Sequence, residues 1–338
     1  MSKPDKGTVV TTQASLSSGD RLNLLVRQIR FEGIGINSYE LVDPTGADLP
    51  PFEAGAHIDI HVEQGITRQY SLCNDPAERH RYVIAVLCDE TGRGGSKKLH
   101  ETVHVQDVVP VSVPRNNFHL KPGGKAILLA GGIGVTPLKS MAHQLARAGV
   151  EYVLHYCAKD LKHTAFREDL GSLGQNGRHQ YHFDDGNPTK GLNIAELLRE
   201  REEDTHLYYC GPAGFMKACA AAAEHWPIDA VHCEHFKAPG AAPNSAPGVA
   251  PGSFVVKMRS NDETVVVGPD QSIVEALAGV GVAIETSCQS GLCGSCKVRY
   301  VSGDVEHNDC ILSDEDHEQY MTACVSRARS GSCLVLDV

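Results

Sequence analysis

The sequence has no long hydrophobic run, no apolar N-terminal segment and a deficit of basic side chains. No stretch approaches the roughly 18 consecutive apolar residues of a transmembrane helix, so we expect no membrane span. Lys and Arg total 31 against 42 Asp and Glu, and the net charge of −11 argues against a nucleic-acid binder or a polybasic membrane-surface protein. Residues 1–20 lack the apolar core of a signal peptide, so we expect a cytoplasmic protein whose thiols stay reduced.

The chain has the composition of a multidomain globular protein with an unusual number of cysteines. Apolar residues make up 41% and charged residues 22%, which is too apolar for a disordered chain. A length of 338 residues favours two or three domains. Six of the 12 cysteines lie in residues 253–338, which also hold 13 acidic and 6 basic residues. In a reducing compartment, clustered cysteines indicate metal or redox chemistry rather than disulfides.

Changes in composition divide the chain into five segments. Residues 1–18 are polar and rich in Ser and Thr, which predicts a flexible tail. Residues 238–252 consist almost entirely of Ala, Pro, Gly, Ser and Asn and predict a linker. We expect one domain over 19–121, a second over 122–237 and a third, strongly acidic one over 253–338.

The three domains differ in their expected fold class. Strands are predicted at 22–33, 57–62, 67–73, 81–88 and 108–114, a pattern that favours an antiparallel barrel or sandwich. The next domain alternates strands (125–130, 151–157, 181–185, 206–210, 229–236) with helices (138–149, 193–200, 213–225). This alternation predicts an α/β domain with a parallel sheet and helices on both faces. The acidic domain is expected to contain a hairpin (253–259, 263–268) and a helix (272–281).

Three of the C-terminal cysteines are closely spaced and a fourth lies farther along. Cys288, Cys293 and Cys296 form a C-x4-C-x2-C pattern, and Cys324 follows 28 positions after Cys296. This is the spacing of plant-type [2Fe–2S] ligation, in which four thiolates converge on two irons. The sequence therefore predicts that these four residues bind a [2Fe–2S] cluster.

Two alternatives accompany this assignment. Zinc usually takes two C-x2-C or Cys/His pairs, whereas this segment contains one C-x2-C. Cys310 competes as the fourth ligand, but it lies in the polar run HNDCILSD, while Cys324 lies in the apolar run MTACV.

Gly291 and Gly294 would let the loop curl around the cluster.

Two glycine-containing turns follow strands of the α/β segment. Residues 131–137 (GGIGVTP) lead into a helix, with Thr136 as its expected N-cap and Pro137 at its first position. The second turn is the CGP of residues 210–212. At the carboxyl ends of parallel strands, such turns suit the pyrophosphate of a dinucleotide. The alternative for each is a tight turn without a ligand.

Two further motifs lie in the β segment. Residues 68–72 (RQYSL) are strand-like, and residues 92–96 (GRGGS) precede a short helix that Ser96 could cap. Backbone N–H groups at the start of that helix would be offered to a phosphate. Either motif alone is common on protein surfaces, and it is their combination that is informative.

With these motifs in this order, the chain resembles the phthalate dioxygenase reductase family, which includes vanillate O-demethylase reductases. The resemblance covers roughly residues 20–338. It implies a ferredoxin–NADP reductase-like protein with a flavin-binding β-barrel, a nucleotide-binding α/β domain and a C-terminal β-grasp ferredoxin domain. It also implies FMN rather than FAD, because no adenine-binding extension is evident.

The resemblance implies roles for individual residues. Tyr70 and Ser71 would contact the isoalloxazine, and Phe236 would cover it; the alternative for Phe236 is a core residue on a terminal strand. The residues implied for the flavin phosphate are Arg68, Gly94, Gly95 and Ser96. Those implied for the nicotinamide dinucleotide are Gly132, Gly134, Thr136, Gly211 and Pro212, with Cys210 close to the nicotinamide. Cys288, Cys293, Cys296 and Cys324 match the family's cluster ligands.

The resemblance implies a reductase that takes a hydride from NADH onto FMN and passes single electrons to the cluster. A flavin can make that conversion. A separate terminal oxygenase of the Rieske non-haem iron type would collect the electrons, and a monomer is expected. NADH is preferred over NADPH, whose 2′-phosphate needs Arg or Lys side chains near the ribose. The segment after strand 151–157 contains Lys159 and Lys162 but no Arg before Arg167. The alternatives are a reductase for a cytochrome P450 or another acceptor, and a non-catalytic iron–sulfur redox sensor.

Overall fold

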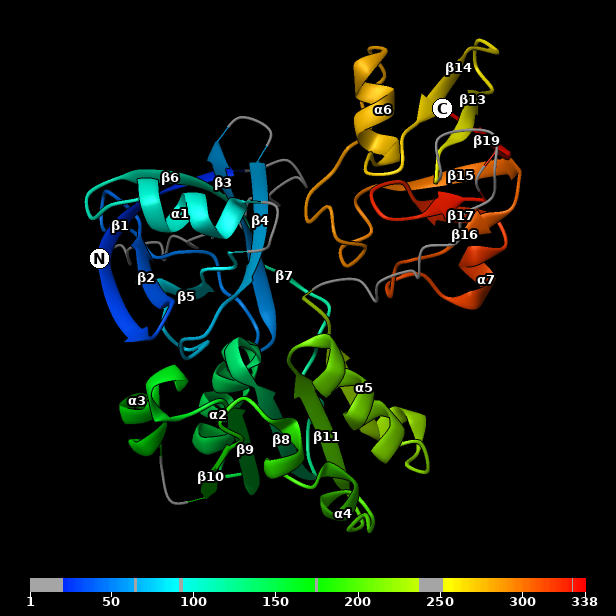
Figure 1. Cartoon of the computed structure of the whole chain (residues 1–338). Coiled ribbons are helices and arrows are strands. Elements are labelled where there is room, and N and C mark those ends of the chain that lie inside the picture. Colours follow the sequence, from blue (N-terminus) through cyan, green and yellow to red (C-terminus); the bar gives the residue numbers. More distant parts are fainter. Residues whose placement is uncertain (1–20, 64–65, 91–93, 174–175, 237–251, 330) are drawn as a thin grey trace, which may run out of the picture.

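The computed structural model describes residues 21–63, 66–90, 94–173, 176–236, 252–329 and 331–338. They form a β-barrel, an α/β unit and a smaller mixed unit, coloured from blue through green to red in Figure 1. The predicted tail, the linker up to residue 251 and residues 92–93 of the GRGGS motif lie outside the described residues. Within the described ranges, no helix is long and apolar enough to cross a membrane.

The N-terminal barrel consists of antiparallel strands in the spatial order β4-β3-β6-β1-β2-β5, with β7 beside β3. A bridge between Leu72 and Ile84 joins the two outer strands and closes the sheet. Along β3, Ile58 and Ile60 enter the core, so His57 and Asp59 lie on the opposite face. The elements are β1 (Arg21–Gly33), β2 (Ile36–Val42), β3 (Ala56–Glu63), β4 (Ile66–Ser71), β5 (Tyr82–Leu87), α1 (Gly95–Thr102), β6 (Val108–Ser112) and β7 (Arg115–Asn116).

The five strands predicted for this segment are confirmed, and β2 and the two-residue β7 are additional. The sequence of β2, INSYELV, interrupts the apolar pattern with Ser38 and Glu40. Both are nonetheless buried, because Ser38 donates to Glu32 and Glu40 pairs with Arg81 at 2.7 Å. A strand whose buried residues are partly polar does not show apolar alternation, so this pattern does not predict it.

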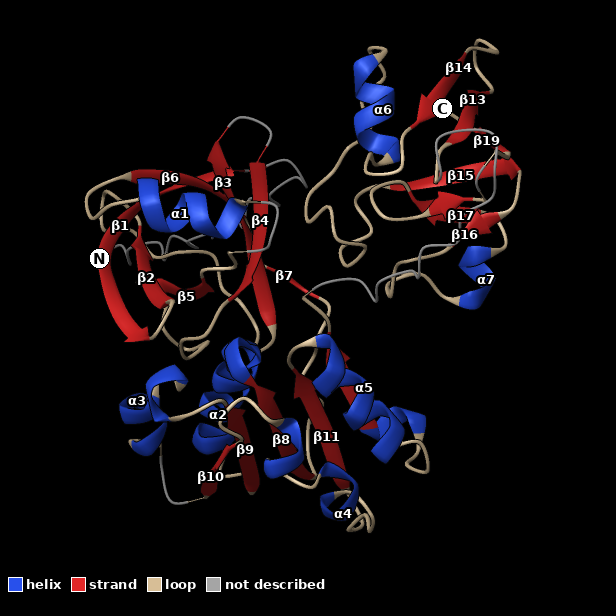
Figure 2. Ribbon diagram, in the orientation of Figure 1, coloured by secondary structure: helices blue, strands red, loops and turns tan. Residues whose placement is uncertain are grey.

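The α/β unit contains a fully parallel sheet in the order β10-β9-β8-β11-β12. Leu128 packs under α2 on one face, and its neighbour Leu129 packs with Trp226 and α5 on the other. Helices therefore cover both faces, as predicted (Figure 2). The elements are β8 (Lys125–Gly131), α2 (Val135–Ala148), β9 (Tyr152–Ala158), α3 (Arg167–Gly171), β10 (Gly177–Phe183), α4 (Ile194–Leu197), β11 (Thr205–Cys210), α5 (Ala213–Ala222) and β12 (Val231–Glu234).

The start of α2 differs from the prediction. A 3-10 turn over Gly132–Gly134 continues directly into the helix, whose N-cap is Gly134. Gly132 takes a positive φ of 54°, which lets the chain turn this early. Thr136 is therefore inside the helix, where its hydroxyl donates to the Ile133 carbonyl at 3.0 Å. The predictions of Thr136 as N-cap and Pro137 as first helical residue are wrong.

The C-terminal unit has a mixed sheet in the order β14-β13-β19-β15-β17 with α6 packed against it. β13 and β14 form the predicted antiparallel hairpin, and β13 pairs in parallel with β19, which gives the β-grasp arrangement. A reciprocal capping box between Ser272 and Glu275 begins α6. The elements are β13 (Phe254–Met258), β14 (Thr264–Val267), α6 (Ile273–Gly279), β15 (Lys297–Ser302), β16 (Val305–Glu306), α7 (Asp314–His317), β17 (Tyr320–Thr322), β18 (Arg327–Ala328) and β19 (Cys333–Leu336).

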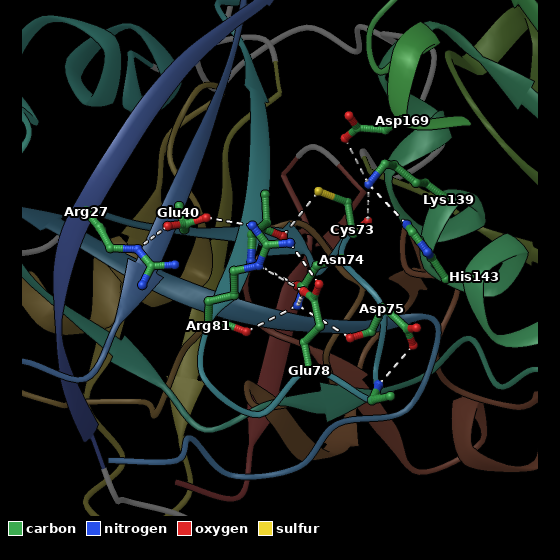
Figure 3. Close-up of polar contacts among 12 residues, drawn as sticks. Arg27, Glu40, Cys73, Asn74, Asp75, Glu78, Arg81, Lys139, His143 and Asp169 are labelled. Carbon is green, nitrogen blue, oxygen red and sulfur yellow. Dashed lines mark hydrogen bonds and ion pairs between the residues drawn. The ribbon is translucent and has the colours of Figure 1, made fainter. Parts of the chain in front are cut away.

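A buried lysine joins the α/β unit to the barrel. Lys139 on α2 is 4% exposed, and its ammonium donates to the carbonyl of Cys73, just after β4, at 3.0 Å. Asp169 and His143 lie 3.4 and 3.3 Å from the same nitrogen (Figure 3). Because a buried charge needs such partners, these contacts fix the α/β unit against the barrel.

Candidate flavin, nucleotide and iron–sulfur sites

The structure brings the four predicted cluster cysteines together. The Cys288 N–H donates to the Cys293 sulfur at 3.5 Å. Cys296 lies beside Cys324, whose preceding residue, Ala323, donates its N–H to the Cys296 carbonyl at 3.0 Å. The loop turns its amides toward sulfur: the N–H groups of Ser290 and Leu292 each lie 3.4 Å from the Cys288 thiol. The donor set of four converging sulfurs with amide donors fits a [2Fe–2S] cluster.

Each pair of sulfurs has one thiol whose pKa is lowered and one whose pKa is raised. Cys288 lowers the pKa of the Cys293 thiol and Cys324 lowers that of Cys296, whereas the pKa values of Cys288 and Cys324 are raised. The thiolate, which is the form that binds iron, is thus favoured at one cysteine of each pair. Cys310, the alternative fourth ligand, instead faces Cys233 and Asp309, and burial raises the pKa of its thiol to about 11.

The two glycine turns of the α/β unit pack against each other. A Cβ on Gly134 would lie 2.2 Å from the Cys210 carbonyl oxygen and 2.7 Å from the Gly211 nitrogen. A Cβ on Gly211 would in turn lie 3.0 Å from the Gly131 Cα. The turns follow β8 and β11, the adjacent strands between which the strand order reverses, and such a switch point is where open α/β sheets bind dinucleotides.

The two barrel motifs also meet. A Cβ on Gly95 would lie 2.2 Å from Nε of Arg68, so the guanidinium crosses the start of α1. Gly94, with a φ of 76°, is the N-cap of this helix. A bare helix start beside an arginine fits a phosphate. The prediction that Ser96 caps the helix is wrong, because Ser96 lies inside it and its hydroxyl accepts the Asp89 N–H at 3.0 Å.

Residues of all three units line one cavity of about 160 Å³. Ser71 comes from the barrel, and Phe236 follows the last strand of the α/β unit. Ser290 and Leu292 come from the cluster-binding loop. A group held here would lie next to both the nucleotide turns and the cysteines.

Two buried ionisable residues in this cavity were not predicted from the sequence. Glu234 is the last residue of β12, and its carboxylate accepts the Ser71 hydroxyl at 3.2 Å. Burial raises the pKa of Glu234 to about 8. His57 is 1% exposed, its Nδ1 lies 3.9 Å from Glu234, and neither ring nitrogen has a hydrogen-bond partner among the described residues. Burial lowers the pKa of His57 to about 4, so the imidazole is neutral at pH 7.

These unpartnered polar atoms fit a heteroaromatic group such as an isoalloxazine, whose ring nitrogens and oxygens need donors and acceptors. The position of Glu234 in the sequence could have identified it as a candidate site residue. It ends the last parallel strand, and side chains at the carboxyl ends of such strands gather at the ligand crevice. His57 gives no such signal, because only its pairing opposite Ser71 on β4 brings it there.

Cys210 is the last residue of β11 and the first residue of the 210–212 turn. It is fully buried, and burial next to Glu234 raises the pKa of its thiol well above the ordinary value. A thiol in this state is neutral at pH 7 and supplies shape rather than charge.

Comparison with known proteins places these sites in one family. Residues 128–221 match the oxidoreductase NAD-binding domain, and residues 256–329 match the 2Fe-2S iron-sulfur cluster binding domain. The reductase subunit of tert-butanol monooxygenase / tert-amyl alcohol desaturase from Aquincola tertiaricarbonis is 53% identical over 324 residues, covering 94% of this chain and 96% of that protein. The vanillate O-demethylase oxidoreductase of a Pseudomonas species is 40% identical over 323 residues, covering 94% of this chain and all of that protein.

Among solved structures, phthalate dioxygenase reductase superposes with a TM-score of 0.77 at 39% identity, covering 94% of this chain and 98% of that one. Its structure is described as modular, for electron transfer from pyridine nucleotides to [2Fe-2S]. The chain belongs to the phthalate dioxygenase reductase family. It is an oxidoreductase with flavin, NAD-binding and 2Fe-2S domains, and its relatives are reductase components of oxygenase systems. The predicted fold class is confirmed for all three domains.

Proposed function

We propose that this chain takes electrons from NADH onto FMN, passes them singly to a [2Fe–2S] cluster, and delivers them to a Rieske-type terminal oxygenase. The observation that carries this proposal is the shared cavity, where Ser71, Phe236 and the cluster-binding loop meet. FMN, when bound, supplies the conversion of an electron pair into single electrons.

The barrel residues are proposed to hold and orient FMN. Arg68 and the helix start at Gly94, Gly95 and Ser96 would bind its phosphate. Tyr70 and Ser71 would line one side of the ring system and Phe236 the other. Glu234 would hold a proton on its carboxyl group at neutral pH, because burial raises its pKa to about 8. The Ser71 hydroxyl, which is hydrogen-bonded to this group, would orient it.

The α/β unit is proposed to orient NADH. Gly132, Gly134, Thr136, Gly211 and Pro212 would surround the dinucleotide, with Cys210 shaping the nicotinamide site. NADH is favoured over NADPH because the segment after β9 carries Lys159 and Lys162 but no Arg before Arg167. The Asp160 carboxylate, which accepts the backbone N–H groups of Lys162 and His163, adds negative charge to the same segment, where a 2′-phosphate would need cationic groups.

Cys288, Cys293, Cys296 and Cys324 are proposed as the cluster ligands. The cluster-binding domain is proposed to meet the oxygenase, because its excess of acidic residues would complement a basic patch on that partner. The chain is proposed to be a cytoplasmic monomer. The oxygenase, and not this chain, would select the substrate, since this chain supplies only electrons. Two relatives are named for systems that act on a tertiary alcohol and on vanillate, so tertiary alcohols and aromatic ethers are the two substrate classes to test.

The direct test is anaerobic addition of NADH to the purified holoprotein. We expect a brown-yellow protein whose flavin and cluster absorbance both bleach, faster with NADH than with NADPH. A colourless protein, or a spectrum unchanged by NADH, would contradict the proposal. Turnover of a Rieske oxygenase with a tertiary alcohol or an aromatic ether would then identify the partner.

A further inference from the structure

One charged contact fastens the cluster-binding loop to the barrel. Ser287, directly before the ligand candidate Cys288, donates its hydroxyl hydrogen bond to Asp59 Oδ2 on β3. Arg115 on β7 donates from Nη2 to the same carboxylate oxygen and to the Ser287 hydroxyl, each at 2.7 Å. We call Asp59, Arg115 and Ser287 the clasp. Nearby, the Asn117 side chain donates to the Leu292 carbonyl at 3.3 Å.

Two of the three clasp residues are buried where the two units touch, and the Arg115 side chain is 36% exposed. Asp59 is 3% exposed and Ser287 6% exposed, although the carboxylate belongs to one domain and the hydroxyl to another. Burying a carboxylate is costly unless charge-assisted hydrogen bonds satisfy it. Asp59 therefore favours the docked arrangement only while Arg115 and Ser287 both donate to it. A clasp of this kind selects one orientation of the loop.

The clasp also lies beside the proposed flavin site. His57 is two positions from Asp59 on the same face of β3, and it lines the shared cavity with Ser290 and Leu292. β7 pairs with β3 so that Arg115 lies opposite His57. The loop is thus tied to the strand that carries a cavity wall, within a few residues of two cluster ligands.

We propose that Asp59 and Arg115 are positioning residues for electron transfer from the flavin to the cluster, acting through Ser287. They hold the cluster-binding loop against the barrel, so that a single electron crosses inside the chain. No bond is made or broken in this step; the flavin is oxidised by one electron and the cluster is reduced by one. The inference rests on the proposed FMN-to-cluster route but not on the identity of the oxygenase.

The test is anaerobic stopped-flow reduction of the holoprotein by NADH, with flavin and cluster absorbance followed separately. Asp59→Asn, Arg115→Lys and Ser287→Ala should each slow flavin-to-cluster transfer by about tenfold or more, because each weakens a charge-assisted hydrogen bond that holds the loop in place. Reduction of the flavin by NADH should change less than twofold. Arg115→Lys keeps the charge but replaces the fixed Nη2 donor with an ammonium on a flexible stem of different shape.

A matched control is Asp262→Asn, which removes an exposed partner of Lys257 in the same C-terminal domain and should leave transfer unchanged. The double variant Asp59→Asn/Ser287→Ala should be no slower than the slower single variant, because its residues share one contact. Cluster content and the cluster's electron paramagnetic resonance spectrum should match the native protein.

Native transfer rates in all three single variants would overturn the proposal. Strictly multiplicative losses in the double variant, or loss of bound flavin or cluster in every variant, would also overturn it. These results concern the variants only, and the same experiment measures NADH-dependent cluster reduction by the native chain independently. That reduction is the separate test of the proposed function.

Discussion

Glu234 shows how one buried residue links stability to pH. Burial raises the pKa of its carboxyl from about 4.5 to about 8. Below pH 4.5 the carboxyl is protonated in both the folded and the unfolded chain. Between about pH 4.5 and 8 only the unfolded chain releases the proton, so the folded state loses stability as the pH rises.

Glu234→Gln should therefore unfold at higher urea concentration than the native protein at pH 8. The difference should shrink to nearly zero at pH 4.5, because a neutral amide has no proton to release. At 1.36 kcal/mol per pH unit, the gain at pH 8 is on the order of a few kcal/mol. The exposed Glu203→Gln is the control, with a gain that stays flat across the same range. A Glu234→Gln gain that does not grow with pH would mean that the carboxyl is ionised when folded.

Cys293 is the best single residue with which to separate the cluster from the flavin. It belongs to the closely spaced cysteine loop, and its neighbour Cys288 lowers the pKa of its thiol. Cys293→Ser should abolish cluster absorbance and electron delivery to an acceptor oxygenase, while NADH still bleaches the flavin. The thiol of Cys310 is proposed not to be a ligand, so Cys310→Ser should leave delivery within about twofold of native. Delivery that survives in Cys293→Ser would show that the cluster ligands are assigned wrongly.

At the scale of elements, the two nucleotide turns depend on each other because Gly134 packs on the Cys210 carbonyl. Gly134→Ala places a Cβ 2.2 Å from that oxygen, so the turns must separate. We expect the KM for NADH to rise at least about tenfold. Gly171→Ala, on α3 with no atom within 4 Å of the new Cβ, should leave the KM unchanged. An unchanged KM in Gly134→Ala would place NADH elsewhere.

Elements with strong apolar periodicity could be predicted from the sequence, and so could sites whose residues are neighbours along the chain. β8, β9 and α2 belong to the first group, and the loop 288–296 belongs to the second. The start of α2 was misplaced because a 3-10 turn begins it without a side-chain cap, at Gly132. β2 was missed because its buried polar residues break the apolar pattern: Ser38 donates a hydrogen bond to Glu32, and Glu40 pairs with Arg81.

The cavity itself could not be predicted, because it depends on tertiary placement. His57 and Glu234 are far apart in sequence, and neither carries a motif. They meet because β3 pairs with β4 and because β12 ends beside the barrel. Single-sequence patterns do not encode such a meeting, whereas a relative with the same domain order does.

At the scale of the whole molecule, the two electron-transfer steps of the cluster should respond differently to salt. The step from the flavin depends on contacts that are largely buried, such as that between Asp59 and Ser287, and buried pairs are screened little. The step to the oxygenase depends on exposed charge, because residues 253–338 hold 13 acidic and 6 basic residues. Association driven by exposed charge slows steeply with ionic strength.

Raising the salt from about 0.05 to 0.5 M should therefore reduce delivery to the oxygenase by about tenfold or more. NADH-dependent reduction of the cluster in the isolated chain should change less than twofold over the same range. Stopped-flow absorbance measures the second rate, and single-turnover product formation measures the first. Neutralising exposed acids on α7, with Asp314→Asn and Glu315→Gln, should reproduce part of the salt effect at low salt. Equal salt sensitivity of both rates would place the acceptor's docking surface outside the acidic domain.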